Sequence, residues 1–156
     1  MSSTPRLFHL LNRARNAAFK TADGELLTRL DVTAAQLGAL FVLGETPDCT
    51  PGDLAERLDL NASAVTGLAE RLERAGLIRR RPHETDRRVT LLALTRAGRD
   101  RIAAARPLMT AVNARLTEGF TAEEVALVAR FLETAAERFA TLRNGDDHDK
   151  KRRVSS

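Results

Sequence analysis

The hydrophobic pattern of this chain changes period once, between residues 77 and 94. Residues 77–81 and 89–94 have the pattern of two β-strands, and residues 82–86 between them have the composition of a turn. Most of the remaining apolar residues recur at helical spacing. Aromatic residues, which strands favour, make up only 4% of the chain. The sequence therefore predicts a mainly α-helical protein with one small β-hairpin.

Apolar spacing marks a first helical segment from residue 5, and residues typical of helix N-termini mark further segments that begin near residues 33, 50, 61, 95 and 121. The first helix is predicted over residues 5–22, with an extension to Leu27 left open. Two short helices are joined by a tight turn at residues 59–61, just before the hairpin. This order is the pattern of a winged helix-turn-helix. Residues 144–156 show no apolar periodicity, and we expect a flexible basic tail over residues 143–156.

Positive charge is concentrated around the second short helix and the hairpin. The whole chain has a net charge of +4, whereas residues 61–101 contain ten Arg and five acidic residues, a net charge of +5. Arg forms the bidentate contacts that recognise phosphates and base edges. A hairpin of this charge repels itself unless a polyanion lies nearby, so we interpret it as a wing that enters the minor groove of DNA. A solvated charged hairpin is the alternative.

Eight residues are predicted to bind DNA. Short polar side chains at the start of the second short helix let the backbone approach base edges, and Arg residues further along suit phosphates. A carboxylate two residues before Arg88 is expected to hold the Arg88 guanidinium in a bidentate pair. The predicted residues are Asn61, Ser63, Thr66, Arg71, Arg81, Asp86, Arg87 and Arg88.

The hairpin and the helix after it carry a family signature. The run from Asp86 to Gly98, DRRVTLLALTRAG, resembles the wing motif D-x-R-x-x-x-L-x-L-T-x-x-G of the MarR (multiple-antibiotic-resistance regulator) family. Residues 54–78 are similar to that family's helix-turn-helix, and the resemblance extends over residues 5–142. By motif match, Asp86 and Arg88 take the wing-tip roles, and Ser63 and Thr66 fall among the base-contacting positions.

The resemblance also implies an architecture and a role. It implies an obligate homodimer in which the terminal helices of both chains interlock, with a dimerisation region over residues 1–30 and 100–142. A winged helix-turn-helix lobe that binds DNA then occupies residues 31–99. The implied role is a bacterial or archaeal transcription regulator, usually a repressor, that binds double-stranded operator DNA and is released by a small ligand.

Members of this family respond to aromatic acids, metals or oxidants. The three His residues lie in different elements, so a metal site is not expected. The first helix has no Cys, and Cys49 lies in a connection, where we interpret it as a buried structural residue; a redox response through Cys49 is the alternative. We expect an aromatic or phenolic carboxylate effector at His9 and Arg13, spaced i,i+4 on the first helix; a solvated polar face of this helix is the alternative.

Other function classes are weaker. The sequence has no paired nucleophile and base, no glycine-rich phosphate loop and no H-E-x-x-H motif, so we expect neither an enzyme nor a cofactor. One Cys excludes a disulfide within the chain and a Cys-based structural zinc site. No apolar run approaches about 18 residues and no signal peptide is evident, so we expect a cytoplasmic protein with no membrane partner. A winged-helix protein-interaction module is the remaining alternative, although such modules usually lack a strongly basic wing.

Overall fold

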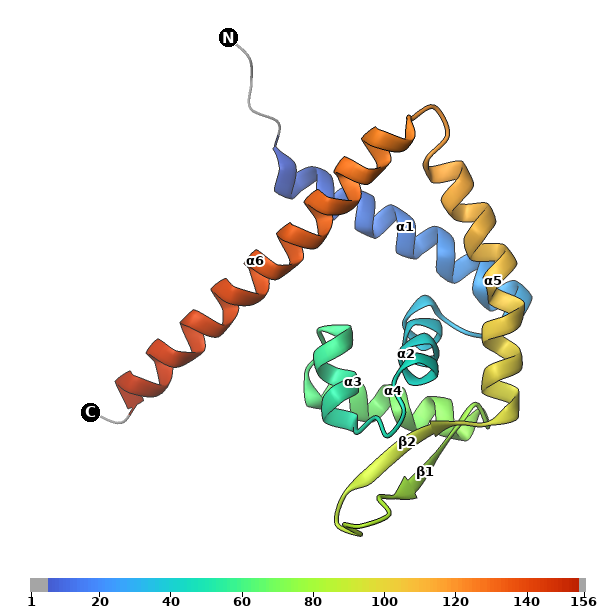
Figure 1. Ribbon diagram of the computed structural model, residues 1–156, viewed down its shortest axis with the longest axis vertical. Helices are drawn as coiled ribbons and strands as arrows, with labels where there is room; N and C mark the ends of the chain where they lie inside the picture. The colour runs from blue at the N-terminus through green and yellow to red at the C-terminus, as the bar shows by residue number, and fades with distance from the viewer. Residues whose placement is uncertain (1–5, 155–156) are drawn as a thin grey trace. The chain divides into compact units, whose positions relative to one another are not determined.

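The computed structural model describes the backbone of residues 6–154 and the side chains of residues 6–141. Within these ranges the chain has six helices and one two-stranded antiparallel sheet (Figure 1). The elements are α1 (Leu7–Leu30), α2 (Ala34–Glu45), α3 (Pro51–Leu58), α4 (Ala62–Arg74), β1 (Ile78–Pro82), β2 (Thr90–Leu94), α5 (Arg96–Leu116) and α6 (Ala122–Val154). The predicted fold, mainly helical with a small β-wing in a winged helix-turn-helix, is confirmed.

Reciprocal capping boxes fix the starts of three helices. At α2, the Thr33 hydroxyl accepts a hydrogen bond from the Gln36 N–H at 3.1 Å, and the Gln36 side chain accepts one from the Thr33 N–H at 2.8 Å. Two of the four unpaired N–H groups that every helix start leaves are satisfied in this way. The same arrangement joins Thr50 to Asp53 at α3 and Thr121 to Glu124 at α6.

Two helices are longer than the sequence pattern predicts. Helix α1 continues through Gly24 to Leu30, because Leu26 and Leu30 are buried in the core and their packing outweighs the low helix propensity of glycine. Helix α6 extends beyond residue 142 to Val154. The side chains from residue 142 onward lie outside the described ones, and the flexible tail predicted over residues 143–156 stays a prediction.

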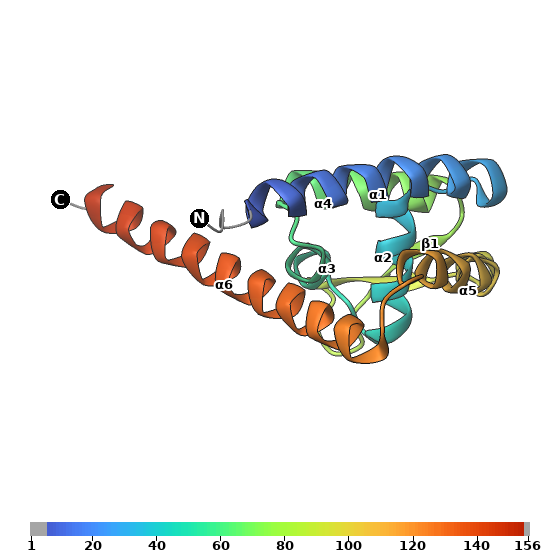
Figure 2. The same ribbon diagram turned by 90° about the horizontal axis from the view of Figure 1, so that it is seen from above.

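Backbone contacts divide the chain into two compact units, Met1–Met109 and Thr110–Ser156, and α5 contributes to both. The first unit contains the hydrophobic core. Its buried side chains come from the end of α1, from α2, α3 and α4, from both strands and from the first half of α5. Seen from above in Figure 2, α2 begins beneath α1 and passes beside α5, in agreement with the core that these helices share.

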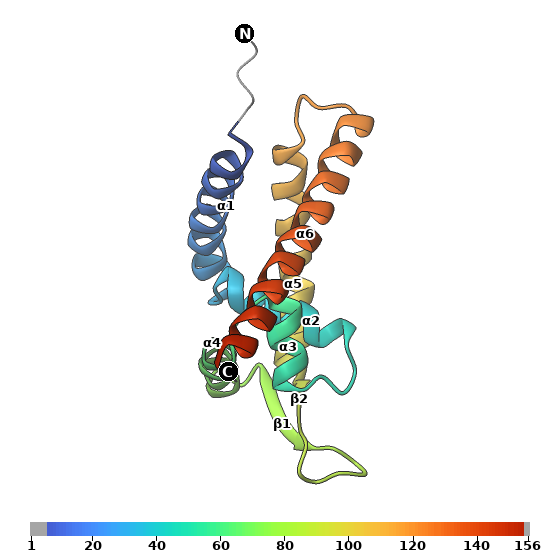
Figure 3. The same cartoon turned by 90° about the vertical axis from the view of Figure 1, so that its left-hand side faces the viewer.

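The hairpin is an extension of this core. Ile78 pairs with Leu94 and Pro82 with Thr90 in an antiparallel register. The chain just before α3 adds a bridge on the other edge of β2, where the Leu92 N–H donates to the Cys49 carbonyl at 2.8 Å. In Figures 1 and 3 the hairpin projects beyond α4, at the end of the first unit away from α1. The wing is therefore anchored at its base and exposed at its tip.

Candidate nucleic-acid interface

The turn between α3 and α4 sets the position of α4. Asp59 ends α3 in the left-handed conformation, with φ 53°, and the Leu60 N–H donates to the Ala55 carbonyl at 2.9 Å. Asn61 then begins α4, and its side-chain oxygen accepts from the Ala64 N–H at 2.8 Å. This hydrogen bond occupies one lone pair of the Asn61 oxygen and leaves the amide N–H groups available for DNA.

Helix α4 has one buried face and one exposed face. Val65, Leu68 and Leu72 are at most 2% exposed and fix the helix to the core. The predicted base-contacting residues Ser63 and Thr66 lie on the exposed face. The Thr66 hydroxyl donates to the Ala62 carbonyl at 2.8 Å, and this hydrogen bond leaves its oxygen free to accept and its methyl group exposed. Short polar side chains of this kind let a helix enter the major groove closely.

The wing tip differs from its prediction in one contact. The Asp86 carboxylate accepts from the backbone N–H of Arg88 at 3.0 Å. Within residues 6–141, the structure has no ion pair between Asp86 and the Arg88 guanidinium, so the predicted bidentate pair is wrong. The physical reason is local: an Asp side chain reaches the N–H two residues ahead and closes a turn. Asp86 therefore shapes the loop, and the Arg88 side chain is exposed.

The arginines of the wing and of α4 differ in whether they form an ion pair. Arg80 pairs with Glu73 of α4 at 3.0 Å, and Arg81 pairs with Asp48 in the connection between α2 and α3. Arg79, Arg87 and Arg88 are exposed, and no ion pair involves them in the described part of the chain. Arg71 is likewise exposed on α4 and has no ion pair among these residues. Five of the predicted DNA-binding residues are therefore exposed in the first unit: Ser63, Thr66, Arg71, Arg87 and Arg88. Arg81 instead forms an ion pair with Asp48, which the sequence analysis did not identify.

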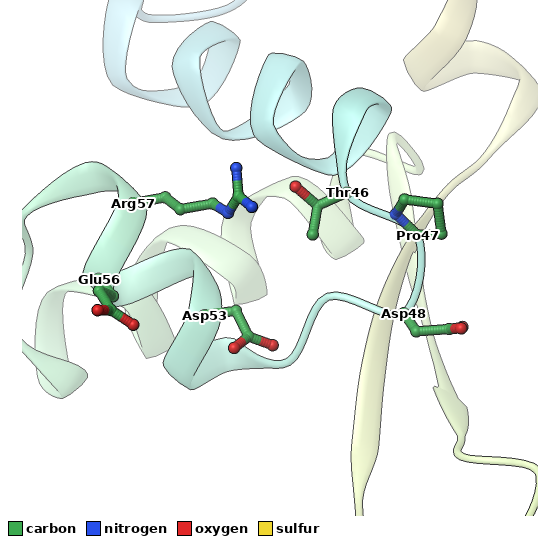
Figure 4. Close-up of a pocket in the computed structure, with 6 residues that line it drawn as sticks. All are labelled: Thr46, Pro47, Asp48, Asp53, Glu56 and Arg57. Carbon is green, nitrogen blue, oxygen red and sulfur yellow. The ribbon is translucent and has the colours of Figure 1, made fainter.

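The predicted effector residues lie elsewhere. His9 and Arg13 are both exposed on α1, and neither lines either of two concavities in the first unit. One concavity, of about 480 Å³, is polar (Figure 4). The other, of about 300 Å³, lies between α2 and α5 and combines an aromatic ring, apolar side chains and two guanidinium groups. Its lining residues are Phe41, Gly44, Glu45, Leu94, Arg99, Ile102, Ala103 and Arg106.

Cys49 is fully buried beside β2. Burial raises the pKa of its thiol, the nearby Asp53 carboxylate raises it further, and Arg57 partly opposes them. A raised pKa keeps the sulfur protonated at neutral pH, and a protonated thiol is a poor nucleophile. This environment favours the structural interpretation of Cys49.

Within the described residues, no cluster of three or more His, Cys, Asp or Glu side chains has the geometry to hold a metal ion. No single described helix has both the length and the hydropathy to cross a membrane; α1 and α2 meet these criteria only as a pair, with a bend of 75° between them.

Comparison with known proteins identifies the family. The model of the MarR family matches residues 30–89. The transcriptional repressor MdtR of Bacillus subtilis is 33% identical over 83% of this chain and 85% of its own length, and the multiple antibiotic resistance protein MarR of Escherichia coli is 30% identical over 81% and 86%. The crystal structure of Streptococcus pneumoniae FabT in complex with DNA is 27% identical, with a TM-score of 0.74 over 88% of this chain and 97% of that one. The chain belongs to the MarR family, whose members are DNA-binding transcription regulators and not enzymes.

Proposed function

We propose that this protein is a homodimeric repressor that binds a pseudo-palindromic operator and is released by a small aromatic or phenolic carboxylate. The observation that carries the proposal is the placement of short polar side chains on α4 and exposed arginines on the wing within one compact unit. Helix α4 enters the major groove, and the Arg87 and Arg88 side chains lie in the adjacent minor groove. The names of two relatives support parts of this role, since MdtR is called a repressor and FabT was crystallised with DNA.

Dimerisation is supported by exposed apolar side chains on the terminal helices. On α1, Leu7 and Leu10 are exposed, and on α6 a stripe at helical spacing is exposed as well. Uncovered apolar stripes of this length are a signature of an interface. The α6 stripe comprises Leu127, Val128, Phe131 and Leu132. We assign the dimerisation region to residues 1–30 and 100–142, and the DNA-binding lobe to residues 31–99.

The effector is proposed to bind through a cationic side chain of α1. Its binding is proposed to change the distance between the DNA-binding lobes of the two protomers. His9 and Arg13 are exposed and lie one helical turn apart on α1, as a carboxylate ligand requires. A ligand that prefers the spacing unsuited to successive major grooves weakens operator binding. Coupling of this kind is typically about 5–150-fold in affinity.

A titration of aromatic acids against labelled operator tests this role. Wild-type protein should release the operator, and Arg13→Ala should need more acid to do so. Equal sensitivity of the two proteins would exclude Arg13 as the anion contact. The variant Arg106→Ala then tests whether the acid binds in the concavity between α2 and α5, because Arg106 lines that concavity.

A further inference from the structure

An ion pair links the wing to the connection between α2 and α3. The Arg81 guanidinium on β1 pairs with the carboxylate of Asp48, in the connection between α2 and α3. Arg81 lies opposite Leu91 on β2, and the residue after Asp48 bridges to Leu92 on the other edge of β2. Strand β2 therefore lies between the two partners, and the pair extends over one face of it like a strap.

Both ends of the strap are held in place. Asp48 has φ 58° in a tight turn, and the next residue is fixed by the hydrogen bond from Leu92 to Cys49 at 2.8 Å. The side chains of Arg81 and Asp48 are 32% and 57% exposed, compared with 92% and 72% for those of the solvated Arg96–Asp100 pair. In Figure 4 the Asp48 side chain is directed away from Arg57, so its carboxylate does not face the cation of the polar concavity.

The neighbouring arginine is tied on the opposite face. Side chains alternate along a strand, so Arg80 and Arg81 point to different faces of β1. Arg80 pairs with Glu73 of α4 at 3.0 Å, while Arg81 pairs with Asp48. Each face of β1 is thus connected to a different element of the lobe, and the direction of the hairpin relative to α4 is determined from both sides.

We propose that Asp48 and Arg81 are positioning residues for DNA recognition, which set the angle of the wing so that Arg87 and Arg88 reach the minor groove while α4 occupies the major groove. Arg81 acts through its pair with Asp48 and not as a phosphate contact. This inference rests on the proposed DNA-binding role of the wing.

The direction in which Asp48→Asn changes operator affinity distinguishes a positioning role of Arg81 from a direct contact with DNA. If Arg81 binds a phosphate, Asp48 competes with DNA for its guanidinium, and Asp48→Asn should strengthen binding. If the pair positions the wing, the same substitution should weaken operator binding by about 2- to 5-fold, the scale of one ion pair at the protein surface. Asn is the suitable replacement because it has the shape of Asp and tolerates the left-handed backbone at this position.

The experiment compares Asp48→Asn, Arg81→Gln and the double variant with wild type by fluorescence anisotropy on the operator at matched salt. Asp100→Asn is the control, because it changes the net charge equally in an exposed pair of 4.0 Å. The expected result is a similar weakening in both single variants, no further weakening in the double variant, and near-normal affinity for Arg81→Lys. Hydroxyl-radical footprints should lose the minor-groove protection of the wing and keep the contacts of α4. Melting curves followed by circular dichroism establish that each variant is folded at the assay temperature.

Two results would contradict the positioning role of the Asp48–Arg81 pair. One is tighter operator binding by Asp48→Asn than by Asp100→Asn, and the other is equal binding by these two variants. Failure of the proposed function looks different, because wild-type protein would then bind no DNA sequence better than random DNA. Selective binding by wild type together with normal binding by Asp48→Asn removes the positioning role alone.

Discussion

A Cβ atom at Gly98 would lie 2.2 Å from the carbonyl oxygen of Leu77, so the start of α5 packs directly against the backbone that leads into β1. The Thr95 hydroxyl accepts from the Gly98 N–H at 3.1 Å, and the Thr95 N–H donates to the same Leu77 carbonyl at 3.1 Å. The Thr and Gly of the wing motif thus form one junction that joins the wing to α5.

The first prediction concerns this junction. Gly98→Ala should lower the free energy of unfolding by about 1–3 kcal/mol or more, because the added methyl group meets backbone that cannot move aside. Gly38→Ala is the matched control. The nearest atom there is 3.7 Å away, an ordinary contact, and Ala in the interior of α2 should stabilise the protein by about 0.5–1 kcal/mol. Urea unfolding measures both, and equal stability of the two variants would contradict the close approach.

The second prediction concerns Cys49. Burial, and after it Asp53, raises the pKa of the thiol in the folded protein, so folding is favoured while the thiol stays protonated. That contribution is complete below the ordinary thiol pKa of about 8.5 and is lost as the pH rises through the higher pKa of the folded state. Alkylation by iodoacetamide at pH 7 should be slow in the folded protein and fast in urea. Release of DNA by peroxide, abolished in Cys49→Ser, would instead assign the sensor role to Cys49.

The third prediction concerns acid stability at α3. The hydroxyl and the N–H of Thr50 both donate to the Asp53 carboxylate and lower its pKa. A lowered pKa contributes stability that is present at neutral pH and is lost as the pH falls through the folded-state value. Asp53→Asn should therefore be less stable than wild type near neutral pH, and the difference should shrink below pH about 4. A difference that stays constant from pH 7 to pH 3 would show that the charge has no part in it.

The fourth prediction distinguishes contacts that hold the protein on any DNA sequence from contacts that recognise particular bases. Arg88→Ala should weaken binding to many sequences and lower the slope of log affinity against log salt by about 0.9, because one cation is removed. Ser63→Ala and Thr66→Ala should change which bases are preferred, by about 1–3 kcal/mol at the affected position. Normal binding by Arg88→Ala at matched salt would contradict the assignment of the wing.

The fifth prediction concerns the oligomeric state. Light scattering should give about twice the chain mass of 17.1 kDa. Phe131→Asp should shift the equilibrium toward the monomer, because it places a charge in the α6 stripe that is proposed to lie in the interface. Wild-type protein that stays folded and monomeric at micromolar concentration would exclude the dimer.

The sequence predicts the elements of the DNA-binding lobe because its signals are local. Thr33 and Thr50 are cap residues with partners three positions ahead, and the strands are marked by a change of period. The predicted ion pair between Asp86 and the Arg88 guanidinium is wrong for a local reason as well. The Asp86 carboxylate bonds to a backbone N–H, and a pattern of side chains does not reveal which donor a carboxylate will choose.

Contacts between distant residues could not be predicted in this way. Arg81 and Asp48 are 33 positions apart, and only the folded sheet brings them together. The length of α1 was underestimated because Leu26 and Leu30 are buried by packing, which periodicity alone does not report. Asp48 itself stands in a Pro-Asp turn, where its sequence context indicates loop chemistry and not a partner on the wing.

Selection of DNA from a random-sequence pool by the wild-type protein tests the central claim most directly. A symmetric dimer with α4 in successive major grooves should enrich a pseudo-palindrome whose half-sites are about 10 base pairs apart, one turn of the double helix. Enrichment of unpaired half-sites, or no enrichment over the starting pool, would contradict a dimeric regulator that recognises its operator through α4 and the wing.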